Sequence, residues 1–99
     1  MKFVMSWTPR PSTGEAELAR SLQIFAKWSP PETVTFHQFV GRIDARGGYA
    51  FVETDDVLQL NKDIQLFAPF LDFDLHPVED IAATAQNAGE AVALRQSIS

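Results

Sequence analysis

Hydrophobic and polar positions along this chain repeat with two periods, one typical of strands and one typical of helices. Short runs rich in β-branched and aromatic residues alternate in polarity and predict strands, whereas apolar residues three or four positions apart predict helices. In chain order the predicted elements are strand 2–7, helix 13–28, strands 33–42 and 48–54, helix 57–67, strand 72–78 and a helix from residue 79 to residue 94.

Local signals indicate where these elements begin and end. Ser12 followed by Glu15 has the spacing of a capping box, which predicts the start of the first helix. The run Asp55-Asp56 suits the start of the second helix, because carboxylates accept hydrogen bonds from the free amide groups there. Pro69 ends that helix, since proline cannot continue it.

The order of the elements predicts an α+β fold. Strand, helix, strand, strand, helix, strand is the ferredoxin-like β-α-β-β-α-β order, followed here by an extra C-terminal helix. Both central helices are then expected to pack on one face of an antiparallel four-stranded sheet. No repeat, linker or low-complexity tract interrupts the chain, so residues 1–99 are expected to form a single domain.

Alternation within the strands predicts which side chains lie on the sheet face that the helices leave open. In residues 48–54 the smaller alternate positions suit packing under helices, and in residues 72–78 Phe73 and Leu75 do so. The open face is therefore expected to hold Tyr49, Phe51, Glu53, Asp72, Asp74 and His76.

The strand predicted at 33–42 has a less regular pattern. The helix-facing set is predicted to be Val34, Phe36 and Val40, and the open-face pair His37 and Phe39. Gln38 falls among the apolar set, so a β-bulge that resets the register is an alternative.

Eight Phe and two Trp are a large aromatic load for 99 residues, because a domain this short buries a modest fraction of its surface. The predicted open face is too apolar to be left in water, so we expect a second copy to cover it. Two such sheets paired face to face through a two-fold interface form a dimeric α+β barrel. The expected partner is therefore the chain itself, in a homodimer or a higher oligomer.

Four runs carry a resemblance to a known family: residues 6–11 (SWTPRP), 36–42 (FHQFVGR), 47–56 (GGYAFVETDD) and 76–78 (HPV). Over nearly its whole length the chain resembles a family of short bacterial proteins described only as a domain of unknown function. The resemblance implies a ferredoxin-like fold of the dimeric α+β barrel type and transfers no activity or catalytic residue. More loosely, the architecture looks like that of small cofactor-free monooxygenases, haem-degrading enzymes and ligand-sensing regulator domains.

The candidate catalytic residues are His37, His76 and Glu53, which all lie in predicted strands. Imidazole is the group best suited to proton transfer near neutral pH, and together with a carboxylate it can also bind zinc or non-haem iron. The alternative is that each histidine is a hydrogen-bonded polar group at a strand end or subunit interface. No cofactor is expected, and the absence of Cys excludes thiolate ligands and cysteine nucleophiles.

The candidate ligand-binding residues are Trp7, Tyr49, Phe51 and Arg46. Their aromatic rings suit the walls of a mostly apolar pocket, and Arg46 lies in the predicted hairpin, where a guanidinium could bind an anionic group. A core or interface aromatic, and a solvated turn with a weak surface ion pair, are the alternatives.

The formal net charge is -5, and it is concentrated in residues 53–99, which carry -7, whereas residues 1–52 carry +2. This balance argues against nucleic acid as a partner, because nucleic-acid binding needs a positive surface. The apolar runs are too short to span a membrane, and residues 1–7 lack the features of a signal peptide. A cytoplasmic location is the default expectation.

Three functions remain as hypotheses. The first is a homodimeric barrel that binds a small apolar or aromatic molecule, with cofactor-free oxygenation or isomerisation as the activity to test if it is an enzyme. The second is a non-catalytic ligand-sensing or assembly module. The third is a metal-binding protein that uses His and Glu ligands.

Overall fold

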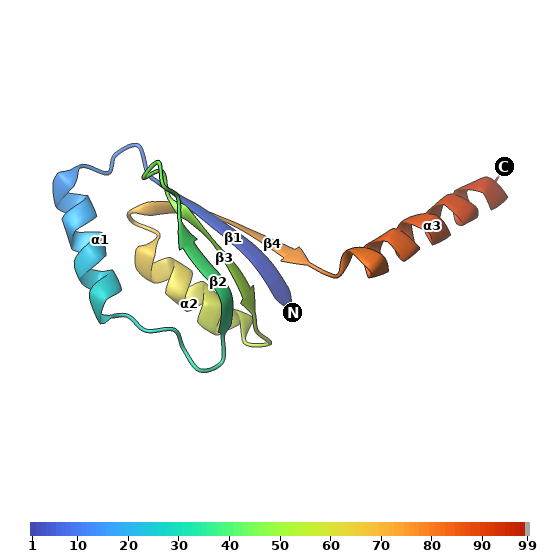
Figure 1. Ribbon diagram of the computed structural model, residues 1–99, viewed down its shortest axis with the longest axis horizontal. Helices are drawn as coiled ribbons and strands as arrows, with labels where there is room; N and C mark the ends of the chain where they lie inside the picture. Colours follow the sequence, from blue (N-terminus) through green and yellow to red (C-terminus); the bar gives the residue numbers. More distant parts are fainter. Residues whose placement is uncertain (99) are drawn as a thin grey trace.

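A computed structural model describes residues 1–98 of the chain. The elements are β1 (Lys2–Pro9), α1 (Glu15–Lys27), β2 (Thr35–Gly41), β3 (Gly48–Glu53), α2 (Val57–Phe67), β4 (Leu71–Val78) and α3 (Ile81–Ser97). The strands form one antiparallel sheet in the order β2-β3-β1-β4, as Figure 1 shows. Element order and sheet together confirm the ferredoxin-like α+β fold predicted from the sequence.

A small core lies between α2 and the sheet. Residues at alternate positions of the two central strands point toward the helix, as the pleat requires. The buried apolar side chains are Phe3, Met5, Val34, Ala50, Val52 and Leu60. In contrast, α1 contributes no buried residue, although its apolar stripe faces the same side of the sheet. The core therefore rests on one of the two central helices.

A β-bulge in β2 changes which side chains reach the helix side. Phe36 lies opposite Val52 and Phe39 opposite Ala50, with one extra residue between them at the register shift. The extra residue keeps Phe36 and Phe39 on the same face, although they are three positions apart. The prediction that Phe39 lies on the open face is therefore wrong.

The same register corrects the placement of Val40. It lies opposite Tyr49, and residues directly opposite one another in a sheet share a face, so Val40 belongs to the open face. The prediction that Val40 faces the helices is therefore wrong, because strict alternation along β2 does not allow for the extra residue of the bulge. The alternative of a bulge near Gln38 is confirmed.

Helix starts follow the expected chemistry at one site and differ at another. Asp56 is the N-cap of α2, and its side chain accepts a hydrogen bond from the Gln59 amide at 3.1 Å. α1 begins at Glu15, two residues later than predicted, and Gly14 is its N-cap. Glu17 accepts a hydrogen bond from the Gly14 amide at 3.2 Å, so the predicted capping box at Ser12 is wrong by two positions.

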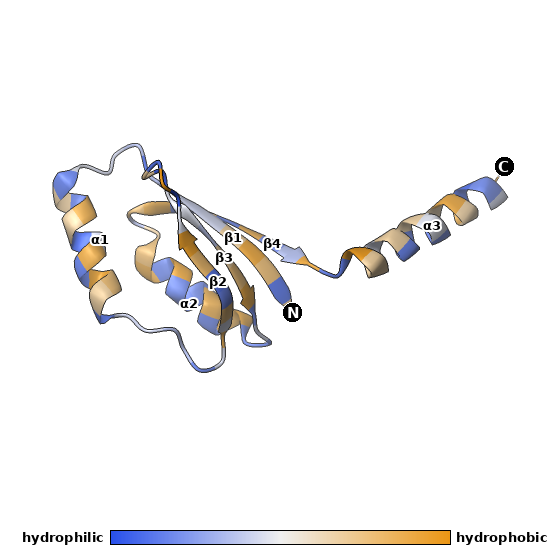
Figure 2. Ribbon diagram, in the orientation of Figure 1, coloured by the Kyte–Doolittle hydropathy of each residue, from blue (hydrophilic) through white to orange (hydrophobic). Residues whose placement is uncertain are grey.

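The C-terminal helix α3 extends away from the sheet and the other helices (Figure 1). It contains no buried residue, and it continues to Ser97, beyond the predicted end at residue 94. The molecule measures 60 × 30 × 23 Å, and its radius of gyration is 17.8 Å, against about 13 Å for a compact domain of this length. Apolar and polar residues both occur along α3 (Figure 2). The helix is thus an arm that does not contribute to the core.

None of the helices within residues 1–98 combines the length and hydropathy that a bilayer-spanning helix needs.

Candidate functional site

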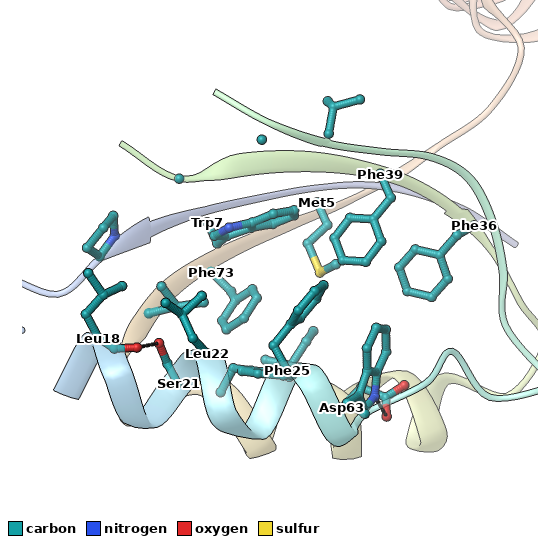
Figure 3. Close-up of a pocket in the computed structure, with 18 of the residues that line it drawn as sticks. Met5, Trp7, Leu18, Ser21, Leu22, Phe25, Phe36, Phe39, Asp63 and Phe73 are labelled. Carbon is teal, nitrogen blue, oxygen red and sulfur yellow. Dashed lines mark hydrogen bonds between the residues drawn. The ribbon is translucent and has the colours of Figure 1, made fainter. Parts of the chain in front are cut away.

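A pocket of about 440 Å³ lies between α1, α2 and the helix-facing side of the sheet (Figure 3). Its walls are almost entirely apolar. Its lining includes an aromatic cluster that we define as Trp7, Phe25, Trp28, Phe36, Phe39, Phe67 and Phe73. Seven of the eleven aromatic residues of the chain therefore gather around one space.

The rings of the aromatic cluster contact one another in the arrangements that aromatic pairs prefer. Phe36 and Phe39 stack with centroids 5.0 Å apart, and Trp7 meets Phe39 edge to face at 5.5 Å. Trp28 contacts Phe36 edge to face at 5.8 Å and stacks on Phe25 at 5.9 Å. Each such pair stabilises its geometry by about 0.5–1.5 kcal/mol beyond the area it buries, so the walls hold one another in place.

Helix α1 forms one wall of the pocket because it is attached at both ends and stands off the sheet between them. Before the helix, Arg10 donates from Nε to the Ala68 carbonyl at 2.6 Å, and the Thr13 hydroxyl donates to the Phe70 carbonyl at 3.0 Å. After it, Trp28 donates from its indole Nε1 to Asp63 at 3.2 Å.

The middle of α1 carries Leu18, Leu22 and Phe25 toward the pocket, as Figure 3 shows. These side chains are 51%, 57% and 48% exposed even though they line it. Solvent therefore reaches the space between α1 and the sheet.

Two glycines allow Trp7 to occupy its wall. Gly48 lies directly opposite Trp7, and a Cβ placed there would come within 2.4 Å of the indole ring and of the Val40 carbonyl oxygen. Gly47 has φ +117°, and its Cβ would clash with the Trp7 backbone. Gly48 thus makes room for the indole of Trp7, and Gly47 makes room for the backbone that carries it.

Among residues 1–98, Asp63 is the one charged side chain that lines the pocket, and it projects from α2. Its Oδ1 accepts hydrogen bonds from the Trp28 indole and from the Gln59 side-chain amide, both at 3.2 Å. Its Oδ2 is buried, and no residue within 1–98 donates a hydrogen bond to it. The sequence does not distinguish Asp63, because a lone Asp on a helix with apolar neighbours resembles a solvated position.

The open face of the sheet brings two of the predicted catalytic residues together. His37 Nε2 lies 2.9 Å from Glu53 Oε1, and its ring lies against Phe51 with centroids 5.4 Å apart. Both members of the pair are more than two-fifths exposed. His37 is the extra residue of the bulge, and its side chain lies on the open face beside Glu53, as the alternation predicted.

His76 lies on the same face but does not join the pair. It is opposite Val4 on β1, Val4 is opposite Phe51 on β3, and β2 follows β3 in the sheet. Three strand spacings of about 4.8 Å separate β4 from β2, so the backbones at His76 and His37 are about 14 Å apart. The two histidines of one chain cannot act on the same atom.

The predicted ligand-binding residues divide between the two faces. Trp7 lines the pocket, whereas Tyr49 and Phe51 lie on the open face. Arg46 lies in the β2–β3 turn, where its backbone amide donates to Asp44 Oδ1 at 3.2 Å. The candidate residues of one chain therefore form two separate surfaces rather than one site, and their roles stay predictions.

The β2–β3 turn is held by an ion pair between Arg42 and Asp44. Arg42 donates from Nε to Asp44 Oδ1 at 2.9 Å, and a second bond joins Nη2 to Oδ2. The hydrogen bond from Arg42 lowers the pKa of the Asp44 carboxyl, and the same bond raises the pKa of Arg42. Arg42 therefore stabilises the turn.

No group of three or more His, Cys, Asp or Glu side chains within residues 1–98 is arranged to hold a metal ion. The nearest approach to a ligand set, His37 with Glu53, supplies two groups. A zinc site needs three or four protein ligands, so one chain does not provide it from its described residues.

Sequence patterns alone do not distinguish a pocket wall from a filled core. The helical spacing of Phe25 and Phe67 and the strand alternation of Phe36 and Phe73 are consistent with either. The signal that could have revealed the pocket is the excess of rings on facing elements over what one small core can bury. Asp63 carried no such signal.

Comparison with known proteins places the chain in a family without giving it an activity. A family model described as "Domain of unknown function (DUF3303)" matches residues 1–92 of the 99-residue chain, and the chain belongs to that family. No curated protein and no solved structure matches the chain. The predicted resemblance is confirmed, and any function must be argued from the geometry.

Proposed function

We propose that this protein binds a small apolar, partly aromatic molecule in the pocket between α1, α2 and the sheet. The observation that supports the proposal is the aromatic cluster itself. Its rings surround about 440 Å³, which is within the range of about 300–1,000 Å³ typical of small-molecule sites, with few polar groups among the walls. An occupant that covers half-exposed apolar walls removes them from water, which favours binding.

The expected affinity follows from the size of the pocket. A ligand of about twenty non-hydrogen atoms that gains about 0.3 kcal/mol per atom binds with about 6 kcal/mol, which corresponds to a Kd on the order of tens of micromolar. Titrations in the micromolar to millimolar range are therefore appropriate.

Binding in the pocket does not by itself imply catalysis. His37 and Glu53 lie on the opposite face of the sheet from the aromatic cluster. A cofactor-free oxygenase or isomerase that used His37, His76 and Glu53 would need its substrate on the open face, with the histidines of two chains brought together. For the pocket we therefore propose ligand binding rather than catalysis.

The test is a fluorescence titration with the neutral probe N-phenyl-1-naphthylamine, whose emission rises in apolar sites. Leu22→Trp adds bulk to a pocket wall and should reduce binding at least several-fold. Leu58→Trp is the matched control, because Leu58 lies on α2, is 79% exposed and does not line the pocket. Equal binding by the wild type and Leu22→Trp would place the probe elsewhere and refute the proposal.

The arm α3 favours a second role, assembly with a second copy of this chain. Its 17 residues span about 25 Å, and helices in proteins owe most of their stability to packing against other surfaces, so a protein surface would stabilise it. Ile81, Val92 and Leu94 are 82%, 43% and 61% exposed. The open face, with Val4, Tyr49 and Phe51, offers an apolar surface that a partner copy would cover.

Light scattering after size-exclusion chromatography tests the assembly role. The double variant Val92→Glu/Leu94→Glu should shift a dimer to a monomer, because charged side chains on the arm oppose burial. The control is Gln86→Glu/Gln96→Glu, which adds the same charge to the same helix. A monomeric wild type, or a dimer retained in the apolar-to-Glu variant, would contradict assembly through α3.

A further inference from the structure

We infer that the pocket selects molecules in which an aromatic or apolar body carries a protonated amine, and that Asp63 is the residue that binds the amine. The inference rests on the proposed function, since it names the ligand class of that same pocket. The Asp63 carboxylate lies among otherwise apolar walls.

The Asp63 carboxylate is held in one orientation by two donors on the same oxygen. The indole Nε1 of Trp28 and the side-chain amide of Gln59 both donate to Oδ1 at 3.2 Å. This leaves Oδ2 as the free oxygen, and it is buried with no donor among residues 1–98. A buried acceptor without a partner costs free energy, so a ligand that donates a hydrogen bond to Oδ2 recovers that free energy on binding.

The charges around the pocket select a cation rather than a neutral donor. No Lys, Arg or His side chain within residues 1–98 forms an ion pair with Asp63. A protonated amine would supply both the missing hydrogen bond and the missing countercharge, and charge-assisted hydrogen bonds are the stronger class.

The position of Asp63 determines the shape of the ligand. Figure 3 places Asp63 at one end of the pocket and Leu18 near the other, with Trp7, Phe39 and Phe73 between them. A ligand with its amine at one end and its apolar body extended along the rings matches this arrangement. An anionic ligand is disfavoured, because Asp63 is the one charged group in the lining.

Isothermal titration calorimetry of the full chain with matched probes tests the inference. The probes are 4-phenylbutylamine, 4-phenylbutanol, 4-phenylbutyrate and butylbenzene, which share one apolar body and differ in the head group. The wild type should bind the amine about tenfold or more tightly than the alcohol, and the carboxylate most weakly.

Asp63→Asn keeps an acceptor for Trp28 and Gln59 and removes the charge, so it should reduce the preference for the amine to near unity while butylbenzene binds as before. Asp74→Asn is the charge-matched control, because Asp74 lies on the open-face side of β4 and does not line the pocket.

Two results would overturn the inference in different ways. If butylbenzene and the alcohol bind the wild type as tightly as the amine does, binding in the pocket is supported and the proposed role of Asp63 is refuted. If none of the probes binds, both proposals are refuted. The wild-type preference alone decides the matter if Asp63→Asn does not fold, so the test does not depend on that variant.

Discussion

At the scale of single residues, the shape of the pocket depends on Gly48, which has no side chain. Gly48 lies opposite Trp7 on β3, and it lies opposite Gly41 on β2. The indole of Trp7 occupies the space that a Cβ at Gly48 would fill. The backbone of the hairpin and the aromatic wall are therefore coupled through one glycine.

Gly48→Ala should displace Trp7 and weaken N-phenyl-1-naphthylamine binding. The added Cβ would lie 2.4 Å from both the indole and the Val40 carbonyl, and overpacking of this kind costs about 1–3 kcal/mol of the free energy of unfolding. Gly41→Ala is the control, because no atom lies within 4 Å of a Cβ there. Urea unfolding of both variants measures the difference, and an equal loss in the two would contradict this role for Gly48.

The Arg42–Asp44 ion pair predicts a pH dependence of the β2–β3 turn. The pKa of Asp44 is lower in the folded chain than its unfolded value of about 3.9, so its contribution to the turn is present above that pH. The contribution is lost as the pH falls through the folded pKa, where the carboxyl binds its proton.

A carboxyl-carbon NMR titration checks this prediction. The midpoint for Asp44 should lie below 3.9, and Arg42→Gln should raise it, because the side-chain hydrogen bond from Arg42 is the main cause of the shift. Arg95→Gln, on the distant α3, should leave the midpoint unchanged. An Asp44 midpoint that is the same in the wild type and in Arg42→Gln would show that the ion pair does not form in solution.

At the scale of elements, α1 is attached at its two ends and open in its middle. It has no buried residue, whereas α2 buries Leu60 and the central strands bury four side chains of the core. Local opening is easiest where few apolar side chains are buried. A ligand between α1 and the sheet would add the missing contacts.

Hydrogen exchange should therefore distinguish α1 from the rest of the domain. Its amides should exchange well before those of β1 and β3, and saturating N-phenyl-1-naphthylamine should slow them selectively, because the ligand bridges the helix and the sheet. Exchange from α3 serves as the internal control and should not respond. Protection of α1 equal to that of β3 without ligand would contradict the open arrangement.

The elements themselves were largely predictable from the sequence, and their details were not. The period of the apolar positions identified every strand and helix, because burial on one face imposes it. The bulge in β2 was available only as an alternative, since alternation fails at one extra residue and Phe39 and Val40 then exchange faces. The start of α1 was misplaced because Ser12 with Glu15 has the same spacing as Gly14 with Glu17, and Gly14 offers no side-chain oxygen that would mark it as the N-cap.

The candidate site was less predictable than the fold. The pairing of His37 with Glu53 follows from strands that neighbour each other, so their shared face was foreseeable. The separation of His76 depends on the strand order, and the pocket depends on how far α1 stands from the sheet. Local periodicity encodes neither the strand order nor the distance between α1 and the sheet. Asp63 becomes distinctive only through its buried Oδ2.

At the scale of the whole molecule, the sheet separates two surfaces with different chemistry. The aromatic cluster and Asp63 lie on the helix side, and the His37–Glu53 pair lies on the open face. The arm α3 extends beyond both, which suits contact with another copy. The proposed ligand binding and the proposed assembly therefore use different surfaces, so a variant that disrupts one need not disrupt the other.

An isotope-filtered NOESY spectrum of labelled protein with unlabelled N-phenyl-1-naphthylamine locates the bound probe directly. Met5 and Val4 are neighbours on β1 that point to opposite faces, and Met5 lines the pocket whereas Val4 does not. We expect contacts from the probe to the methyl groups of Met5, Leu22 and Leu60, and none to those of Val4. Contacts to Val4 instead would move the binding site to the open face and refute binding in the pocket.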